Sequence, residues 1–273
     1  MDYCSGVWGY GKLDKINTVQ NRAIRYFLGT HKFSPNLAIN GDMGWVSSKT
    51  RRGVEMGRLW NRLVNMEEGR VTKKVFLWDK GLCKRNWSNE VKQMLIENDM
   101  EDAFVANSHI NLKTLNDSMH QHDCTEWSTD VVKFDKLRTY ITFKTELCKE
   151  EYVNIVTNRQ HRSALAQFRS GVLPLKIETG RFQNIPLEYR LCVLCNQDVI
   201  ESESHFLLYC SKYSELRQSF YTSLNLCNMH PDFNHCTDGQ KLTTLMSSEY
   251  VKATAKFIWQ CYDLRRKTLY VTR

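Results

Sequence analysis

The stretch Arg190-Leu-Cys-Val-Leu-Cys-Asn-Gln-Asp-Val-Ile-Glu-Ser-Glu-Ser-His-Phe-Leu-Leu-Tyr-Cys210 carries the pattern that most constrains the fold of this chain of 273 residues. Cys192 and Cys195 form a C-x2-C pair, and nine residues later His205 and Cys210 form an H-x4-C pair. Two residues between cysteines allow a tight turn that directs both sulfurs toward one ion. The order Cys-Cys-His-Cys therefore predicts a Cys3His metal site.

The spacing of the second ligand pair predicts an interrupted helix. On a continuous α-helix, residues five apart point about 140° away from each other, which is too far to hold one ion. We therefore expect His205 near the start of a short helix, Cys210 at its end, and Ser211 as the N-cap of the next helix. Residues 196–198 (Asn-Gln-Asp) are typical of a turn, and residues 201–204 can cap the His-bearing helix.

Three thiolates and one imidazole make a closed tetrahedral site, which favours one structural Zn2+ over iron, copper or a catalytic metal. The alternative is that four unrelated side chains lie near each other in the sequence. For two weaker groups an incidental or core role is the simpler interpretation, and these groups are His120, His122 and Cys124, and Cys227, His230, His235 and Cys236.

Apolar residues recur every three or four positions along most of the chain, which predicts a mainly α fold of helical bundle segments with one small zinc-bound knuckle and helix. The expected helices are 13–28, 48–66, 86–100, much of 131–170, and 249–270. The expected inward faces of the first two are Leu13, Ile16, Val19, Ala23, Ile24, Phe27 and Leu28, and Val54, Leu59, Leu63 and Val64. The predicted regions are a basic helical region at 1–100, a polar linker at 101–130, helices plus the Cys3His module at 131–222, and a loop with a C-terminal amphipathic helix at 223–273.

Composition places the chain among ordinary globular proteins, with 42% hydrophobic and 25% charged residues. No apolar run reaches the roughly 18 residues that a membrane span needs, and no basic segment followed by an apolar core begins the sequence. We therefore expect an intracellular protein, in the nucleus or cytoplasm, without a membrane partner. No phosphate-binding glycine loop is present, so a small-molecule substrate is not expected.

The positive charge is uneven along the sequence. Residues 1–90 hold 16 of the 38 Lys and Arg but only 8 of the 30 Asp and Glu, so they account for the whole net charge of +8. This asymmetry favours RNA or DNA as a partner for the first third, and the alternative is a solvated basic helix face. The candidate nucleic-acid-binding residues are Arg22, Arg25, Arg51, Arg52, Arg58 and Arg62.

The zinc motif and its flanks resemble the C-terminal part of LINE-type non-LTR retrotransposon reverse transcriptases. The similar stretches are Arg190-Leu-Cys-Val-Leu-Cys, His205-Phe-Leu-Leu-Tyr-Cys, Ala164-Leu-Ala-Gln-Phe-Arg-Ser-Gly, Leu173-Pro-Leu, Ile177-Glu-Thr-Gly-Arg-Phe, and, near the N-terminus, Leu13-Asp-Lys-Ile, Val19-Gln-Asn-Arg and Phe27-Leu-Gly. The resemblance covers most of the chain in patches and implies a thumb-like helical region, a Cys3His zinc module and contact with RNA or DNA.

The sequence departs from that family where the chemistry would lie. It contains no Asp-Asp dipeptide, although the polymerase palm needs clustered carboxylates to hold its metal ions. Nothing resembles an endonuclease domain, so we expect no enzymatic activity. The resemblance implies a non-catalytic C-terminal fragment of such a reverse transcriptase that binds zinc and RNA or DNA. The alternatives are a zinc-stabilised protein-interaction module and a decayed retroelement product without function.

Overall fold

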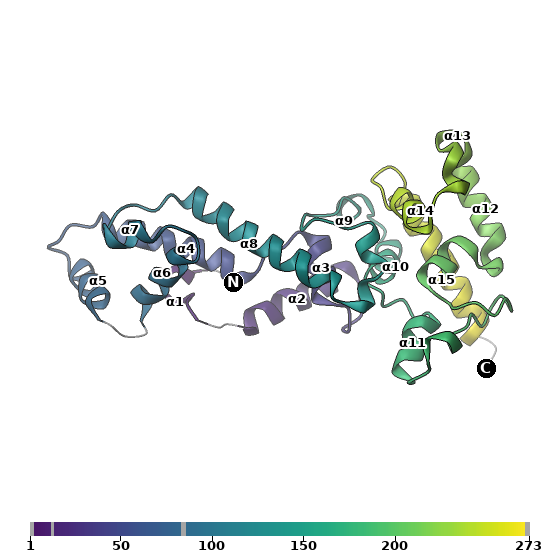
Figure 1. The fold of residues 1–273 in the computed structure, drawn as a ribbon, viewed down its shortest axis with the longest axis horizontal. Helices are drawn as coiled ribbons and strands as arrows, with labels where there is room; N and C mark the ends of the chain where they lie inside the picture. The colour runs from purple at the N-terminus through teal and green to yellow at the C-terminus, as the bar shows by residue number, and fades with distance from the viewer. Residues whose placement is uncertain (1–2, 12–13, 83–85, 271–273) are drawn as a thin grey trace. The chain divides into compact units, whose positions relative to one another are not determined.

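The structure is a computed structural model that describes residues 3–11, 14–82 and 86–270 (Figure 1). Within these ranges the chain forms helices and no strand, and two isolated β-bridges join Met43 to Lys149 and Leu191 to Ile200. The mainly α fold class predicted from the sequence is confirmed. The α-helices are α1 Ser5–Trp8, α2 Asp14–Leu28, α3 Asn36–Met43, α4 Ser48–Val64, α5 Val71–Gly81, α6 Trp87–Ile96, α7 Glu101–Val105, α8 Leu112–Val132, α9 Tyr152–Ile155, α10 Arg159–Arg169, α11 Lys176–Phe182, α12 Ser214–Ser223, α13 Leu226–Met229, α14 Asp238–Leu245 and α15 Val251–Tyr270.

The chain divides into two compact units, with boundaries inside α2, between α3 and α4, and inside α8. Unit 1 consists of residues 1–20 and 46–126, and unit 2 consists of residues 21–45 and 127–273. This grouping differs from the four consecutive regions predicted at 1–100, 101–130, 131–222 and 223–273. Each unit is made of two stretches that are distant in sequence, so a division into consecutive regions does not match the units.

Unit 1 is built on α4, which packs against α1, α5 and α6. Trp60 of α4 is fully buried, contacts Phe76 edge-on at 5.4 Å between ring centroids, and donates from Nε1 to the Ser108 carbonyl at 3.0 Å. Asn61 exchanges two hydrogen bonds with the backbone of Ile110 at 2.8 and 2.7 Å. The predicted core residue Leu63 is buried. These polar contacts fix the segment before α8 against α4.

The predicted polar linker is wrong, because residues 101–130 contain α7 and most of α8. Asn111 caps α8 by accepting from the backbone N–H groups of Lys113 and Thr114. The helix buries about one apolar residue per turn, and the buried residues are Leu115, Met119, Trp127 and Val131. A stripe that narrow leaves most of the sequence polar, so composition suggested a linker where tertiary packing produces a helix.

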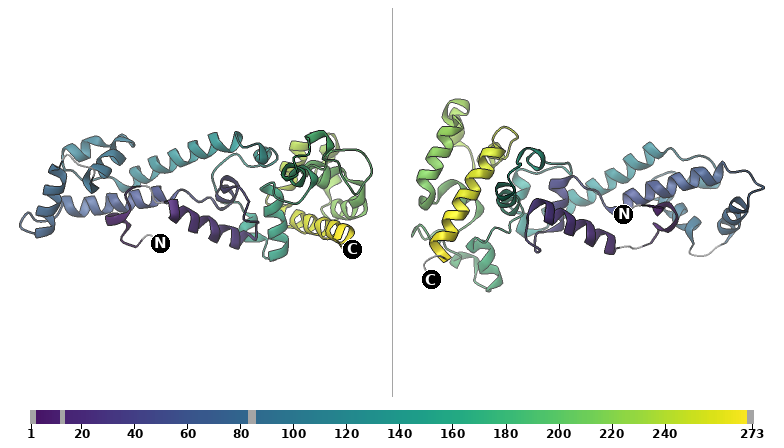
Figure 2. Two further views of the ribbon diagram at one scale, coloured as in Figure 1. Left: turned by 90° about the horizontal axis from the view of Figure 1, so that it is seen from below. Right: turned by 180° about the vertical axis from the view of Figure 1, so that it is seen from behind.

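Unit 2 has its core between α10, α12 and α15 (Figure 2, yellow C-terminal helix). Phe257 of α15 stacks on Phe220 of α12 with ring centroids 4.5 Å apart and an interplanar angle of 5°. The predicted C-terminal amphipathic helix is confirmed, with Val251, Ala255 and Ile258 buried. This helix belongs to the same core as the Cys3His motif rather than to a separate region.

A buried ionic network also lies in unit 2, around Arg169 at the end of α10. The guanidinium of Arg169 is fully buried and bonds Asp42 at 2.8 Å and Glu150 at 2.9 Å. Tyr140 and Tyr152 donate their hydroxyls to the same Asp42 carboxylate at 3.0 and 2.7 Å. Burial, and then the neighbouring Asp42 charge, hold the pKa of both tyrosines well above its usual range, so both act as donors.

The predicted inward face of α2 needs correction. In α2 the buried apolar residues are Ile24 and Leu28, whereas Val19, Ala23 and Phe27 of the predicted inward face are exposed. The buried side of this helix includes the polar Gln20 and Asn21, which hydrophobic spacing does not reveal; Lys12 and Leu13 lie outside the described residues.

The predicted helical run at 131–170 is only partly correct. After α8 ends, the chain passes through two 3-10 turns at Asp135–Leu137 and Tyr140–Thr142 before α9 and α10. Val132, the last residue of α8, is exposed. In the part of the chain that the structure describes, no helix has the length and apolarity to cross a membrane.

Candidate metal centre

The four predicted ligands come together in unit 2, and their ligand atoms all lie within 4.8 Å of one another. The sulfurs of Cys192 and Cys210 are 3.9 Å apart, and the Cys195 sulfur is 3.4 Å from Nε2 of His205. Tetrahedral zinc with its usual bond lengths places two sulfurs about 3.8 Å apart and a sulfur about 3.6 Å from a nitrogen. The arrangement could therefore hold one metal ion such as zinc.

The knuckle that carries the first two cysteines is a short antiparallel pairing closed by a tight turn. The backbone N–H of Cys192 donates to the Val199 carbonyl at 2.8 Å, and that of Glu201 donates to the Arg190 carbonyl at 3.0 Å. Asn196 and Asp198 adopt φ values of 50° and 49° in the turn. Asparagine and aspartate tolerate this left-handed conformation better than other non-glycine residues. The turn predicted at 196–198 is confirmed.

The second ligand pair is set by a π-helical turn at His205–Tyr209. The N–H of Cys210 donates to the His205 carbonyl at 2.8 Å, which is the i to i+5 bond of a π turn. Ser202 accepts from the N–H of His205 at 3.1 Å, as expected of a cap. The wider turn solves the spacing problem that an α-helix would pose, because residues five apart face more nearly the same way.

Arg217 of α12 fixes the end of this turn from inside the core. Its guanidinium donates to the carbonyls of Leu207 and Cys210, both at 3.0 Å. Phe206 and Leu208 are buried with Phe168 of α10 in the core of unit 2. The ligand-bearing turn is therefore part of the main core, so metal binding and the folding of unit 2 are coupled.

Glu201 links the knuckle to the C-terminal helix. One carboxylate oxygen accepts from Arg265 of α15 and from the Lys176 N–H, both at 2.7 Å, and the other lies 3.9 Å from the Cys192 sulfur. Glu201 and Arg265 are 1% and 5% exposed, so both charges depend on this pairing. From the sequence, Glu201 was expected only as part of the 201–204 cap of the His-bearing helix, and Arg217 and Arg265 were not expected near the site. For Arg265 no local signal exists, because 64 residues separate it from Glu201.

The electrostatic setting of the ligands favours a neutral imidazole and shared thiol protons. Burial lowers the pKa of His205, and the charge of Arg217 lowers it further. The hydrogen bond from Cys192 lowers the pKa of Cys210, whereas the same bond and burial raise the pKa of Cys192 well above its usual range. Burial raises the pKa of Cys195. A metal ion must therefore displace the protons of Cys192 and Cys195, which these thiols would otherwise keep.

The two weaker groups of His and Cys do not form comparable sites among the described residues. No second group of three or more His, Cys, Asp or Glu ligand atoms converges there. Cys124 lies 3.3 Å from Nδ1 of His120 as a pair on α8, while His122 lines a different cavity in unit 1. In the C-terminal group, the side chain of Cys227 lies outside the described part.

The predicted basic surface of α4 is partly buried. Arg52 is 3% exposed and donates to the carbonyls of Ser48 and Gly9 at 3.0 and 2.6 Å, which corrects its expected place on an exposed face. Arg51 is half-buried and donates to Gln20 at 2.7 Å. These two guanidinium groups hold the backbone and neighbouring side chains of unit 1.

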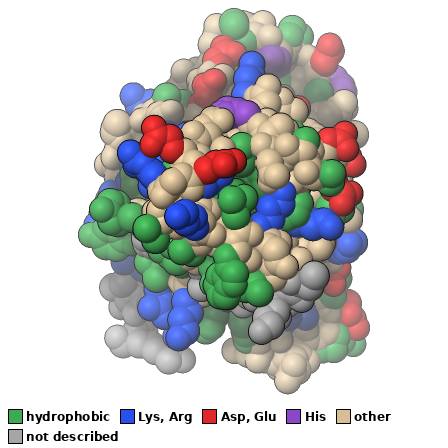
Figure 3. Space-filling model, turned by 90° about the vertical axis from the view of Figure 1, so that its left-hand side faces the viewer, with side chains coloured by type: hydrophobic (Ala, Val, Ile, Leu, Met, Phe, Trp, Pro, Cys, Tyr) green, Lys and Arg blue, Asp and Glu red, His purple; other side chains and the backbone are tan. Residues whose placement is uncertain are grey.

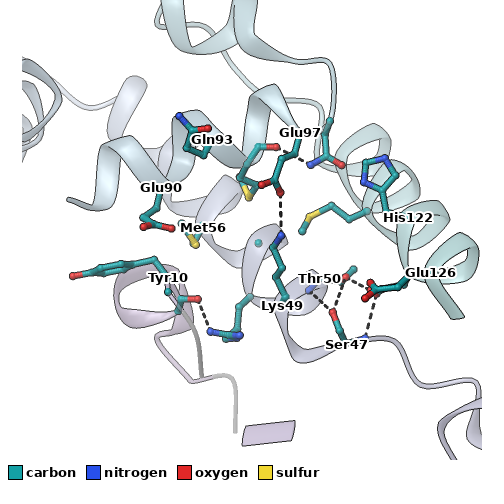
Figure 4. Close-up of a pocket in the computed structure, with 18 of the residues that line it drawn as sticks. Tyr10, Ser47, Lys49, Thr50, Met56, Glu90, Gln93, Glu97, His122 and Glu126 are labelled. Atoms are coloured by element: carbon teal, nitrogen blue, oxygen red, sulfur yellow. Dashed lines mark hydrogen bonds and ion pairs between the residues drawn. The ribbon is translucent and has the colours of Figure 1, made fainter. Parts of the chain in front are cut away.

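The N-terminal half of α4 also faces an acidic cavity of about 500 Å³ in unit 1. Figure 4 shows Lys49 reaching across it to Glu97, and the atoms of this ion pair are 3.0 Å apart. Glu90 and Glu126 also line the cavity. Four carboxylates around two cations make this surface a poor site for a polyanion.

The other predicted arginines are more accessible. Arg22, Arg58 and Arg62 are exposed, although Arg58 pairs with Glu55. Arg25 is half-buried and donates to the Ser34 carbonyl at 2.7 Å. The six residues are thus divided between the two units, with Arg22 and Arg25 in unit 2 and the other four in unit 1.

Folding also redistributes the net charge. Unit 2 contains 23 of the 38 Lys and Arg and 16 of the 30 Asp and Glu, a net of +7, which leaves 15 against 14 and a net of +1 in unit 1. The basic residues 46–90 share unit 1 with the acidic residues 91–126. The end of unit 1 that carries α5 accordingly shows blue, red and hydrophobic side chains intermixed (Figure 3).

No protein-family model, curated protein or solved structure matches this chain.

Proposed function

We propose that this protein is a zinc-stabilised, non-catalytic nucleic-acid-binding protein. The observation that carries the proposal is the Cys3His cluster, whose four ligand atoms lie within 4.8 Å of one another beside the core of unit 2 and could hold one metal ion such as zinc. A closed site of this kind leaves no position for substrate or water, so its role is structural. Zinc is the metal whose usual ligands and geometry this set matches.

The nucleic-acid part of the proposal is supported by charge. The net of +7 in unit 2 provides the electrostatic attraction that underlies sequence-independent binding to a phosphate backbone. The resemblance of the zinc motif to the C-terminal part of LINE-type reverse transcriptases supports the same class of partner. Because the sequence holds no Asp-Asp pair, we propose binding without polymerase chemistry.

Metal content of the purified full chain, measured by mass spectrometry under native conditions, tests the zinc assignment. We expect one zinc per chain, and none in a Cys192→Ser/Cys210→Ser variant. Cys236→Ser is the matched control, since this cysteine belongs to the weaker C-terminal group and should leave zinc bound. A well-folded wild-type protein without zinc would overturn the assignment.

Fluorescence anisotropy with a labelled RNA or single-stranded DNA then tests the second part. Affinity should fall steeply with salt, because bound phosphates release counterions. The Cys192→Ser/Cys210→Ser variant should lose both helical signal and binding. Zinc binding without measurable nucleic-acid affinity near physiological salt would refute the nucleic-acid assignment.

One observation favours a second candidate, a zinc-stabilised protein-interaction module. Val71, Val75 and Trp78 form an exposed apolar stripe on α5, with 75%, 55% and 66% of their surfaces accessible. Their spacing is that of a helix face that packs on a partner helix. This candidate predicts zinc binding and no response to oligonucleotides.

A further inference from the structure

Among the exposed aromatic side chains of unit 2, four lie at the ends of α2 and α11 and in the loop after α2. Tyr26 and Phe27 at the end of α2 are 75% and 43% exposed, Phe33 in the following loop is 58% exposed, and Phe182 at the end of α11 is 63% exposed. We call these four residues the aromatic strip. Exposed apolar residues that lie together often mark an interaction site.

Each ring of the aromatic strip carries a cation on one face. Arg159 lies 5.1 Å from the ring centroid of Tyr26, and Arg162 lies 4.8 Å from that of Phe27. In the same way, Lys32 is 5.0 Å from Phe33, and Arg181 is 5.6 Å from Phe182. A ring with one face under a cation and roughly half or more of its surface accessible offers its remaining surface to a ligand.

Contacts with α10 and α11 hold the residues of the strip in place within unit 2. Arg162 donates to the Phe27 carbonyl at 3.2 Å, and its neighbour Ser163 donates its hydroxyl to the Gly29 carbonyl at 2.6 Å. Helix α10 therefore holds the end of α2. The loop that follows brings Phe33 to Phe182, whose ring centroids are 6.4 Å apart. The strip thus combines rings from α2, its following loop and α11.

A hollow of about 340 Å³ lies beside the last two rings. Its lining includes Phe33, Phe182, Gln167 and the ion pair of Lys136 with Glu178. Glu178 is also paired with Arg181 at 3.3 Å, so the one acidic residue of this lining is matched by two cations. In contrast to the acidic cavity of unit 1, this surface carries no net negative charge.

We propose that the aromatic strip binds a single-stranded segment of nucleic acid, with bases stacked on the accessible ring surfaces and the accompanying cations near the phosphates. This proposal rests on the nucleic-acid binding proposed above and names its site and the form of the ligand. Alternation of aromatic and basic side chains suits single strands, because their bases offer free faces that a duplex hides. Stacking is tolerant of sequence, so little base preference is expected.

The test compares the zinc-loaded full chain with Phe33→Leu/Phe182→Leu. Leucine keeps an apolar side chain at these exposed positions but removes the stacking surface, so the fold should be unaffected. The probes are a labelled oligothymidylate of about twenty nucleotides, enough to span several stacking sites, and a duplex of the same length. The matched control is Trp78→Leu, which removes an aromatic side chain that is 66% exposed on α5 of unit 1.

We expect wild type to prefer the single strand, and the double variant to bind it at least about 10-fold more weakly, with an unchanged salt slope. Trp78→Leu should match wild type, and Phe33→Trp/Phe182→Trp should retain affinity. Arg181→Gln should instead reduce the salt slope, since it removes a phosphate contact.

The two proposals fail in different ways. If the wild-type protein binds neither probe, the proposed nucleic-acid function is refuted, and the proposal that the strip binds a single strand is refuted as well. If wild type binds but the Phe33→Leu/Phe182→Leu variant is indistinguishable from it, nucleic-acid binding stands and the strip is overturned. An equal loss from Trp78→Leu, or a preference for the duplex, would also overturn it.

Discussion

Replacing Glu201 by glutamine should destabilise unit 2 although the side chain keeps its shape. Glu201 is 1% exposed, and its carboxylate is the partner of the 5% exposed Arg265 on α15. The amide can still accept one hydrogen bond, but it cannot neutralise the guanidinium. Removing one member of a buried ion pair typically costs about 3–5 kcal/mol, because the other charge stays buried without compensation.

That cost is large for a domain of this size. A domain of 150–250 residues loses about 2–4 °C of melting temperature per kcal/mol, so Glu201→Gln should lower the melting temperature of unit 2 by roughly 6–20 °C. Calorimetry of the zinc-loaded full chain measures this directly, and metal content measured alongside reports whether the knuckle still holds zinc.

Two companion variants make this prediction specific. In Glu201→Gln/Arg265→Met no charge is left buried, so part of the lost stability should return. Asp263→Asn, on the same helix, removes ion pairs with Arg266 and Lys267 at the surface and should leave the melting temperature unchanged within error. A single variant that melts like wild type, or a double variant that is worse than the single one, would refute the reasoning.

Three other perturbations have defined outcomes. Arg169→Met should cost about 3–5 kcal/mol in urea unfolding, because it leaves the Asp42 carboxylate buried without its cation; equal stability would contradict the role of that network. Gly44→Ala should cost at least about 1–2 kcal/mol, since Gly44 has φ +61° and an added Cβ would lie 2.4 Å from the Lys149 nitrogen; a neutral result would show that this turn relaxes. Acidification should release zinc, because protons compete with the metal for the thiolates of Cys192, Cys195 and Cys210. Zinc binding should be strongest at neutral to alkaline pH and should be lost as the pH falls. A zinc-sensitive dye measures the release, and no release on acidification would argue against thiolate ligation.

The metal ligands could be predicted from the sequence because their constraints are local. All four lie within residues 192–210, where the spacing alone requires a knuckle and an interrupted helix. Their supports could not be predicted in the same way. Arg217 and Arg265 are ordinary members of amphipathic helices, and only the fold shows that they contact backbone carbonyls near the ligands and the carboxylate of Glu201.

The same distinction applies to the fold. The helices at α4 and α15 follow from residue spacing, although α4 buries Met56 and Trp60 rather than the expected Val54, Leu59 and Val64. The helix α8 does not follow from spacing, because it buries only four apolar residues in 21. Charge was the least predictable property. Counted along the sequence, the excess positive charge lies in residues 1–90. In the fold, the basic residues 46–90 share unit 1 with acidic helices, so most of the net positive charge belongs to unit 2. The exposed rings of Tyr26 and Phe33 give no sequence signal, since aromatic residues are more often buried.

The discontinuous make-up of unit 2 determines the order in which a growing chain can complete it. Of the two parts of unit 2, residues 21–45 leave the ribosome first. Arg169, the cation that pairs with Asp42, is synthesised 127 residues after Asp42. The last contribution, α15, comes after all four metal ligands. Unit 1, whose parts all lie before residue 127, is complete well before then. Domains that finish early fold early, so unit 1 should fold first and unit 2 should be completed last, once α15 has been synthesised. During that interval the apolar faces of α2 and α3 are open to chaperones, and zinc can meet its ligands before the helix that buries Glu201 exists.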